Sequence, residues 1–188
     1  PGSILPGLLR LPSFGLLLSL AALMLVQPSA ERFRGGVPLL AGLHLGVLAL
    51  AVRMVSSVRD SLTLTWALAA PTIALNLAYL FVHHPALSIA NLAMLAIFYS
   101  HVIRCLLVYV LRDAVVTVDE LFAATCTYVL IAFVFACMYA IEEQLVPGSF
   151  SIPPGPVEGA NTRFFDLLYF SFTALTSTGF GDIHPLAR

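Results

Sequence analysis

The stretch at residues 164–182 reads FFDLLYFSFTALTSTGFGD. It begins with an apolar run, Phe164–Thr176, whose length as a helix would be roughly 20 Å, about two thirds of the hydrocarbon core of a membrane. After this run, Gly179 and Gly181 alternate with larger residues. Glycine reaches backbone angles that other residues avoid, so the alternation allows successive carbonyl groups to point to one side. The stretch therefore predicts a short re-entrant helix and a carbonyl-lined loop that can replace the water around a dehydrated cation.

The rest of the chain has the composition of a membrane protein. Of its 188 residues, 60% are hydrophobic and only 10% are charged, whereas soluble domains carry about 25% charged residues. Five apolar runs reach the roughly 20 residues that a membrane-spanning helix needs, and the short breaks between them favour an antiparallel bundle. We therefore expect an all-α integral membrane protein with five transmembrane helices, a re-entrant pore helix and a filter loop. The expected spans are Leu8–Val26, Val37–Val55, Leu62–Val82, Leu87–Leu111 and Glu120–Val146.

The first span also has the pattern of a signal peptide, with Arg10 before it and Pro28-Ser29-Ala30 after it. We expect a retained helix, with cleavage as the alternative, because further apolar spans follow at once. If the loop after residue 176 faces outside, five spans place the N-terminus in the cytoplasm. Five arginines then lie inside and four outside, in agreement with the positive-inside rule. The inner set is Arg10, Arg53, Arg59, Arg104 and Arg112.

The segment after the short helix supplies the candidate site. Asp182 has two interpretations: a ring of carboxylates that concentrates cations at the outer mouth, or an anchor hydrogen-bonded to the pore helix. Asn161 or Thr162 can cap this helix, and Asp166 lies in its first turn, where carboxylates are favoured. The candidate ion-binding residues are Ser177, Thr178, Gly179, Phe180 and Gly181, with Ser177 adding a hydroxyl at the inner entrance and with Asp182, Thr176 and Asp166 in support.

Residues 165–185 closely resemble the pore loop of potassium channels, most of all bacterial ion-channel proteins of the two-transmembrane pore superfamily with extra helices in front. The matching residues are Phe165-Asp166, Tyr169-Phe170-Ser171-Phe172, Leu175 to Ile183, and Pro185. The family filter is Thr-Val-Gly-Tyr-Gly-Asp, so the resemblance implies ion-coordinating carbonyls at Ser177, Thr178, Gly179 and Phe180. Ser177 lacks the stiffening methyl group of threonine, and Phe180 lacks the phenolic hydroxyl. Potassium is the ion that the resemblance implies.

One filter motif per chain implies several copies around an axis, and a homotetramer would supply them. In the family an inner helix follows the filter, whereas the sequence ends at Arg188. Three explanations remain open: the chain is a fragment of a longer protein, the remainder is disordered or truncated, or another subunit supplies this helix. The expected domains are a four-helix peripheral domain, residues 1–113, and a partial pore domain, residues 114–188.

Two functions remain as hypotheses. The first is a homotetrameric cation channel, selective for potassium, in the lipid bilayer of a bacterial inner (plasma) membrane, with potassium ions in the filter and no other cofactor. The alternative is a non-conducting structural subunit of a larger membrane complex that retains a channel-like fold. A fourfold axis through Gly179 and Gly181 would favour the channel.

Polar residues inside the spans have simpler interpretations. Arg104 and Arg112 lie eight residues apart, whereas a voltage sensor carries arginine at every third position. They fit snorkelling anchors. Asn76 and Asn91 are expected to form hydrogen bonds across helices.

The sequence predicts no enzyme, because it contains no nucleophile with a base, no metal-ligand spacing and no phosphate-binding glycine loop. A net charge of -1 gives no reason to expect nucleic acid. Glu142 and Glu143 at the end of the fifth span have three interpretations: they brace the filter, attract cations or form a solvated helix end. The three cysteines lie in apolar runs and are expected to be buried small hydrophobic residues: Cys105, Cys126 and Cys137.

Overall fold

The computed structural model describes residues 11–30, 36–56, 62–82, 84–112, 116–152 and 164–186. Five of its helices are long and apolar enough to cross a membrane, which confirms the predicted mainly helical membrane fold. A shorter helix and two strands of two residues complete the described elements. Their order is α2 (Pro12–Ala30), α3 (Gly36–Ser56), α4 (Leu62–Phe81), α5 (Pro85–Val110), α6 (Val118–Leu145), β1 (Phe150–Ser151), α7 (Phe164–Leu175) and β2 (His184–Pro185).

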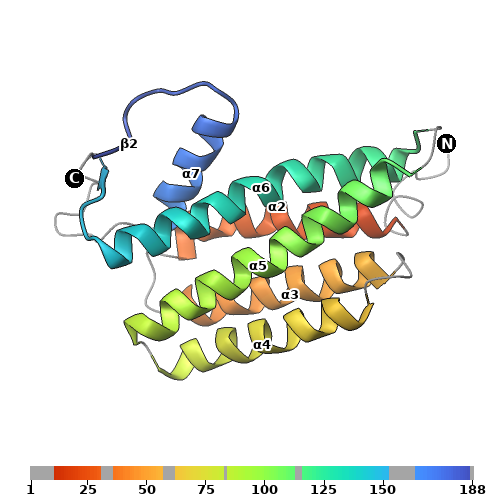
Figure 1. Ribbon diagram of the computed structural model, residues 1–188, viewed down its shortest axis with the longest axis horizontal. Helices are drawn as coiled ribbons and strands as arrows, with labels where there is room; N and C mark the ends of the chain where they lie inside the picture. Colours follow the sequence, from red (N-terminus) through yellow and green to blue (C-terminus); the bar gives the residue numbers. More distant parts are fainter. Residues whose placement is uncertain are drawn as a thin grey trace.

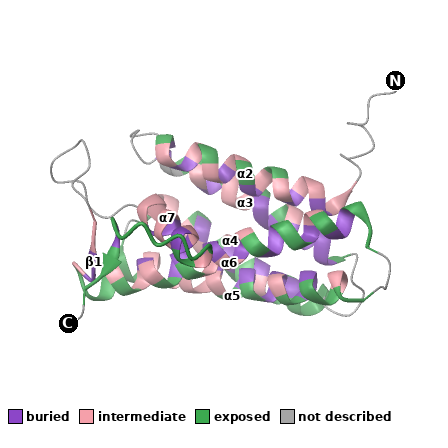
Figure 2. Ribbon diagram, turned by 90° about the horizontal axis from the view of Figure 1, so that it is seen from above, coloured by how far each residue is buried: buried purple, intermediate pink, exposed green. Residues whose placement is uncertain are grey.

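The five long helices form one bundle (Figure 1). Consecutive helices pack against each other from α2 to α6, and α6 also packs on α2. Figure 2 shows the buried residues on the facing sides of the helices and the exposed ones on their outer sides. One continuous core contains residues of all five long helices, α2 to α6, together with Leu168 of α7. The division into a peripheral and a pore domain stays a prediction, because this core runs through both parts.

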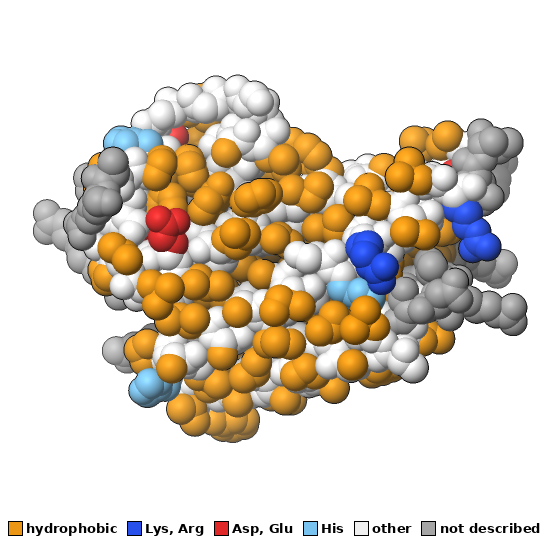
Figure 3. All heavy atoms as spheres, viewed as in Figure 1, with side chains coloured by type: hydrophobic (Ala, Val, Ile, Leu, Met, Phe, Trp, Pro, Cys, Tyr) orange, Lys and Arg blue, Asp and Glu red, His pale blue; other side chains and the backbone are white. Residues whose placement is uncertain are grey.

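The outer sides of the helices are apolar. Leu25, Ile97 and Met138 are all more than half exposed, as expected for side chains in contact with lipid. Figure 3 shows apolar side chains over the middle of one face, with the arginine side chains in the half away from α7. Arg104 and Arg112 are exposed, which agrees with their interpretation as snorkelling anchors. The three cysteines are buried and free, as expected.

Several helix ends differ from the sequence prediction by one to four residues, and two of them have a clear physical reason. Helix α2 continues past Val26 and Pro28 to Ala30, because Gln27 and Ala30 are buried, at 2% and 4% exposure, and packing stabilises the last turn. Helix α6 begins at Val118, two residues earlier than expected. The reason is a capping box in which the Thr117 hydroxyl accepts from the Glu120 N–H and the Glu120 carboxylate accepts from the Thr117 N–H.

A buried carboxylate joins three helices at the bundle end away from α7. Asp119, 7% exposed, accepts hydrogen bonds from the backbone N–H of Ser13 at 3.2 Å and from the Ser13 hydroxyl at 3.2 Å. The Tyr109 hydroxyl donates to the same carboxylate at 2.9 Å. Charge-assisted hydrogen bonds are stronger than neutral ones, so this cluster fixes the starts of α2 and α6 against the end of α5.

The expectation that Asn76 and Asn91 bond across helices is wrong for their amide oxygens. Both oxygens are buried and neither has a hydrogen-bond partner. The two side chains instead line a cavity between the helices. The sequence did not reveal this, because a lone asparagine in an apolar run has the same pattern whether it faces a neighbouring helix or a cavity.

Candidate ion-conduction site

The short helix α7 has the length and position expected of a pore helix. At 1.5 Å per residue its 12 residues cover about 18 Å, less than the ~30 Å core of a bilayer. It stands against the C-terminal half of α6 (Figure 1). Leu167, Leu168 and Ser171 are buried on this side, and the Ser171 hydroxyl donates to the carbonyl of Ala132 on α6 at 2.8 Å. This bond fixes the height of α7 along α6.

The chain leaves α7 through a tight set of hydrogen bonds. The backbone N–H groups of Thr178 and Gly179 both donate to the Thr173 carbonyl, at 3.0 and 3.2 Å. The Thr176 hydroxyl lies 2.8 Å from the Phe172 carbonyl and 2.8 Å from the Thr178 hydroxyl. Since Thr176 has one hydroxyl proton and donates it to a carbonyl, Thr178 donates to Thr176. Thr178, which stands where the potassium-channel filter has valine, therefore has its hydroxyl satisfied within the loop.

Backbone angles alternate along the loop. Ser177, Gly179 and Gly181 have φ of 57°, 51° and 77°. A positive φ is ordinary for glycine and uncommon for serine. The alternation predicted for the two glycines is therefore present and extends one step earlier, to Ser177. A regular helix or strand has no such alternation, so this segment is held in a specific non-repetitive conformation.

The loop is exposed on its own chain. Residues 176–182 are all exposed, and Phe180 is 69% exposed. A Cβ atom built on Gly179 or Gly181 would meet no atom of this chain within 4 Å. Irregular backbone at membrane depth is tolerated only where it is buried in protein or lines water. If the loop lies at membrane depth, it therefore needs a neighbouring chain or an aqueous path beside it.

The outer end of the loop is fastened to α7. The Tyr169 hydroxyl hydrogen-bonds the Asp182 carboxylate, and loss of solvent contact together with this bond and the carboxylate charge raises the pKa of Tyr169. The hydroxyl thus stays protonated as a donor. The same carboxylate accepts from the Ile183 N–H at 3.0 Å, and Ile183 is buried. Of the two interpretations of Asp182, this geometry favours the anchor.

A small sheet fastens the segment after the loop to α6. Strands β1 and β2 are antiparallel, with Phe150 opposite Pro185, and the Leu186 N–H donates to the Ser149 carbonyl at 2.7 Å. On α6, the Glu143 carboxylate accepts from the N–H groups of Gly148 at 2.8 Å and Phe150 at 3.2 Å. Glu143 therefore braces the strand that pairs with the end of the loop, one of its three interpretations.

Three aromatic rings fill the space behind this sheet. Tyr139 of α6, Phe150 of β1 and Phe170 of α7 lie with ring centroids 5.2–5.7 Å apart. Such distances are typical of favourable aromatic pairs. The triad joins the three elements that support the loop.

The structure brings most of the predicted site residues together. Asp166 lies in the first turn of α7 as expected, and the predicted caps Asn161 and Thr162 lie outside the described residues. Sequence reasoning missed the pairing of β1 with β2 and assigned no role to Tyr169 or to the aromatic triad. A signal was present for Tyr169, because an aromatic hydroxyl on a short helix followed by an aspartate after the glycines offers a donor for that acid.

Five apolar helices long enough to cross a membrane, together with a short apolar helix and an anchored loop, indicate a multi-pass membrane protein. Residues 106–188 match the family model described as "Ion channel". The match covers the part of the chain from the last turn of α5 to the end, and it indicates an ion channel domain there. No curated protein and no solved structure matches the chain.

Proposed function

We propose that this chain is a subunit of a homotetrameric potassium channel, with the backbone of Ser177–Gly181 as its selectivity filter. The observation that carries the proposal is the alternation of positive φ at Ser177, Gly179 and Gly181 in a loop anchored at both ends. In this proposal the carbonyl groups replace the hydration shell of the ion, and several ions pass in file.

The exposure of the loop supports an assembly around an axis. Gly179 and Gly181 have no atoms of their own chain near their open side, so identical loops from four chains can approach one another without a steric obstacle from this chain. Closed rotational symmetry is the usual form of such assemblies. The N-terminus then lies in the cytoplasm and α7 enters from the outside, as in the sequence prediction.

Anchoring supports selectivity for a dehydrated ion. The family filter uses tyrosine where this chain has Phe180, which has no hydroxyl to bond. We propose that Tyr169 and Glu143 supply part of this support from outside the filter, through Asp182 and through the backbone N–H groups before and within β1. Preorganised carbonyls need no reorganisation when an ion arrives, which favours the ion that fits them.

The test is cation flux from vesicles that contain the full-length protein. We expect potassium efflux faster than sodium efflux, and loss of both when residues 177–181 are replaced by alanine. Alanine replacement of three exposed residues in the first turns of α4, Leu62, Leu64 and Trp66, is the control and should leave the flux unchanged. Absence of cation flux at every potential would overturn the proposal and favour the structural-subunit alternative.

A further inference from the structure

The loop after α7 contains a strained residue. Ser177 has a φ of 57°, which lies in the left-handed region that favours glycine. For an L-residue this region is about five- to thirtyfold less populated than the right-handed one. Strain of this kind persists only where the surrounding structure over-determines it. The contacts around Ser177 must therefore hold it in this conformation.

Two threonine hydroxyls bridge the strained residue. Thr176 and Thr178 flank Ser177, and their Oγ1 atoms lie 2.8 Å apart. The Thr176 hydroxyl donates to the Phe172 carbonyl at 2.8 Å, so the Thr178 hydroxyl is the donor to Thr176. Both side chains are β-branched, and their restricted χ1 rotation lowers the entropy that this arrangement costs. We call this pair of hydroxyls the hydroxyl clasp. It connects residue 178 to α7 by a route that passes around Ser177.

The backbone bonds show what the clasp keeps in place. The N–H groups of Thr178 and Gly179 both donate to the Thr173 carbonyl of α7, at 3.0 and 3.2 Å. In a planar trans peptide the N–H group and the preceding C=O group point in opposite directions. The carbonyls of Ser177 and Thr178 therefore both point away from Thr173. Two successive carbonyls face one side only because Ser177 has its unusual φ.

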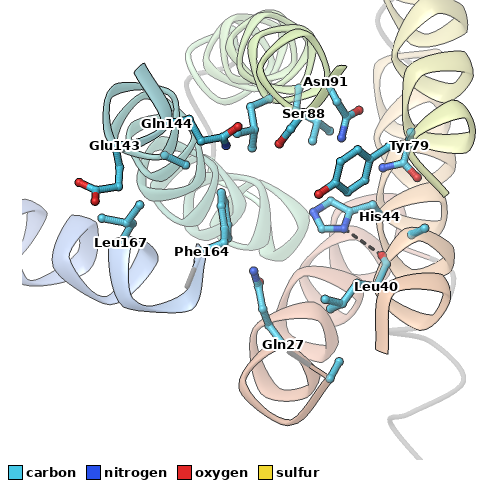
Figure 4. Close-up of a pocket in the computed structure, with 16 residues that line it drawn as sticks. Gln27, Leu40, His44, Tyr79, Ser88, Asn91, Glu143, Gln144, Phe164 and Leu167 are labelled. Carbon is cyan, nitrogen blue, oxygen red and sulfur yellow. Dashed lines mark hydrogen bonds between the residues drawn. The ribbon is translucent and has the colours of Figure 1, made fainter. Parts of the chain in front are cut away.

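The clasp is attached to the firmly held half of α7. Figure 4 shows Phe164 and Leu167, in the first turn of α7, on the wall of a cavity. In the second half of the helix, the Ser171 hydroxyl bonds the Ala132 carbonyl of α6 at 2.8 Å, and Phe172 packs against the main core. The carbonyl that anchors the clasp is thus fixed by the bundle.

We propose that the hydroxyl clasp positions the carbonyls of Ser177 and Thr178 by holding Ser177 at positive φ. Rotation of Ser177 to negative φ would turn the peptide group between residues 177 and 178 and break its bond to α7. A hydrogen bond favours the bonded state about two- to tenfold, which is of the same order as the strain that it opposes. Thr178 is therefore a positioning residue that acts through the backbone. The consequence for ion selectivity rests on the proposed channel function, whereas the clasp itself does not.

The first test is amide hydrogen exchange of the full-length protein in phosphatidylcholine nanodiscs. The N–H groups of Thr178 and Gly179 are bonded to α7 in the strained form of the loop, so their protection reports on that form. We expect Thr178→Val, which keeps the shape and removes the hydroxyl, to raise the exchange rate of both amides about two- to tenfold. Rates are taken relative to an unstructured peptide of the same sequence. Unprotected amides in the wild type, or unchanged rates in Thr178→Val, would overturn the proposal.

Three further variants test the bond itself. Thr178→Ser keeps the hydroxyl and should raise the exchange rates less than Thr178→Val. Thr125→Val is the matched control, because the Thr125 hydroxyl is also exposed and donates within its own helix, to the Leu121 carbonyl; the rates at residues 178 and 179 should not change. Thr176→Val removes the partner hydroxyl, so Thr178→Val should add little to it. Full additivity of the two substitutions would contradict a bond between the hydroxyls.

A rescue experiment separates the strain from the bond. Glycine adopts positive φ about as readily as negative φ, so Ser177→Gly removes the strain that the clasp opposes. Added to Thr178→Val, it should return the exchange rates to the wild-type value or below. D-serine introduced at position 177 by semisynthesis keeps the hydroxyl, prefers positive φ and should do the same. If neither change restores protection, the Thr178 hydroxyl does not act through the backbone angle and the proposal is wrong.

Cation flux from vesicles relates the clasp to selectivity. Thr178→Val should lower the ratio of potassium to sodium efflux about twofold or more, and D-serine at position 177 should restore it. An unchanged ratio in Thr178→Val would overturn the role of the clasp in selectivity. Absence of flux in the wild type, with the exchange pattern as expected, would overturn the channel proposal and leave the clasp intact. Failures of the two proposals are therefore distinguishable.

Discussion

The substitution Gly179→Ala tests the backbone alternation directly. Gly179 has φ of 51°, and an L-residue in this left-handed region costs roughly 1–2 kcal/mol. A Cβ atom at this position would meet nothing in its own chain within 4 Å. The strained backbone angle is therefore the whole free-energy cost of the substitution within one chain. An energy of 1–2 kcal/mol lowers the population of the native loop about 5–30-fold. In a homotetramer the free-energy costs of the four substituted loops add, which gives about 4–8 kcal/mol per channel.

The assay is potassium efflux from vesicles containing the full-length protein. We expect Gly179→Ala to lower the flux at least tenfold, whereas Gly46→Ala should leave it unchanged. Gly46 is the matched control, because it lies inside α3 and a Cβ there also meets nothing within 4 Å. A D-alanine introduced at position 179 by semisynthesis prefers positive φ and should restore most of the flux. If D-alanine is as damaging as L-alanine, the argument from backbone angle is wrong.

Three further predictions concern the contacts that hold the loop at residues 176–182 and the two ends of the bundle. Tyr169→Phe removes the hydroxyl that bonds Asp182, so the ratio of potassium to sodium flux should fall while the unfolding midpoint stays within a degree or so; an unchanged ratio would contradict the anchor. Phe150→Leu removes two aromatic pairs from a residue only 6% exposed, and should lower the free energy of unfolding in an SDS titration by about 1–3 kcal/mol. The control Phe81→Leu, at a residue 83% exposed, should change it little, and equal losses would refute the triad. Asp119→Asn leaves one acceptor oxygen for three donors and should cost about 1.5–3 kcal/mol. A double-mutant cycle with Tyr109→Phe should show coupling of about 1 kcal/mol, and strictly additive losses would argue against the bond.

The long helices could be predicted because their signal is local. Twenty consecutive apolar residues define a span wherever it packs. The helix ends were less accurate where packing decides them: Gln27 and Ala30 extend α2 beyond Pro28 because neighbouring helices bury them. The start of α6 was predictable in principle, since Thr117 and Glu120 have capping-box spacing.

The backbone conformation of the loop at residues 177–181 was also predictable, because its glycines lie in one continuous stretch. The alternating glycines gave the backbone conformation, and only the positive φ of Ser177 was unexpected. The contacts that support the loop were not predictable, because their partners do not lie in one continuous stretch of sequence. Strands β1 and β2 have two residues each and pair across more than thirty positions, which leaves no periodic pattern in the sequence. The bond from Tyr169 to Asp182 likewise depends on how the loop returns over α7.

Helix α6 connects the two fastened ends of the molecule. At its first turn, Asp119 bonds to α2 and α5. Further along, Ala132 accepts the hydroxyl of Ser171 from the pore helix, and its last turns carry Tyr139 and Glu143, which hold α7 and β1. A helix of 28 residues extends about 42 Å. We expect a displacement of α2 or α5 at the Asp119 end to be felt along α6 by the elements that support the loop at residues 176–182. This connection runs through hydrogen bonds and ring contacts within one chain, so mutations at Asp119 and at Glu143 should influence each other although they lie at opposite ends of the helix.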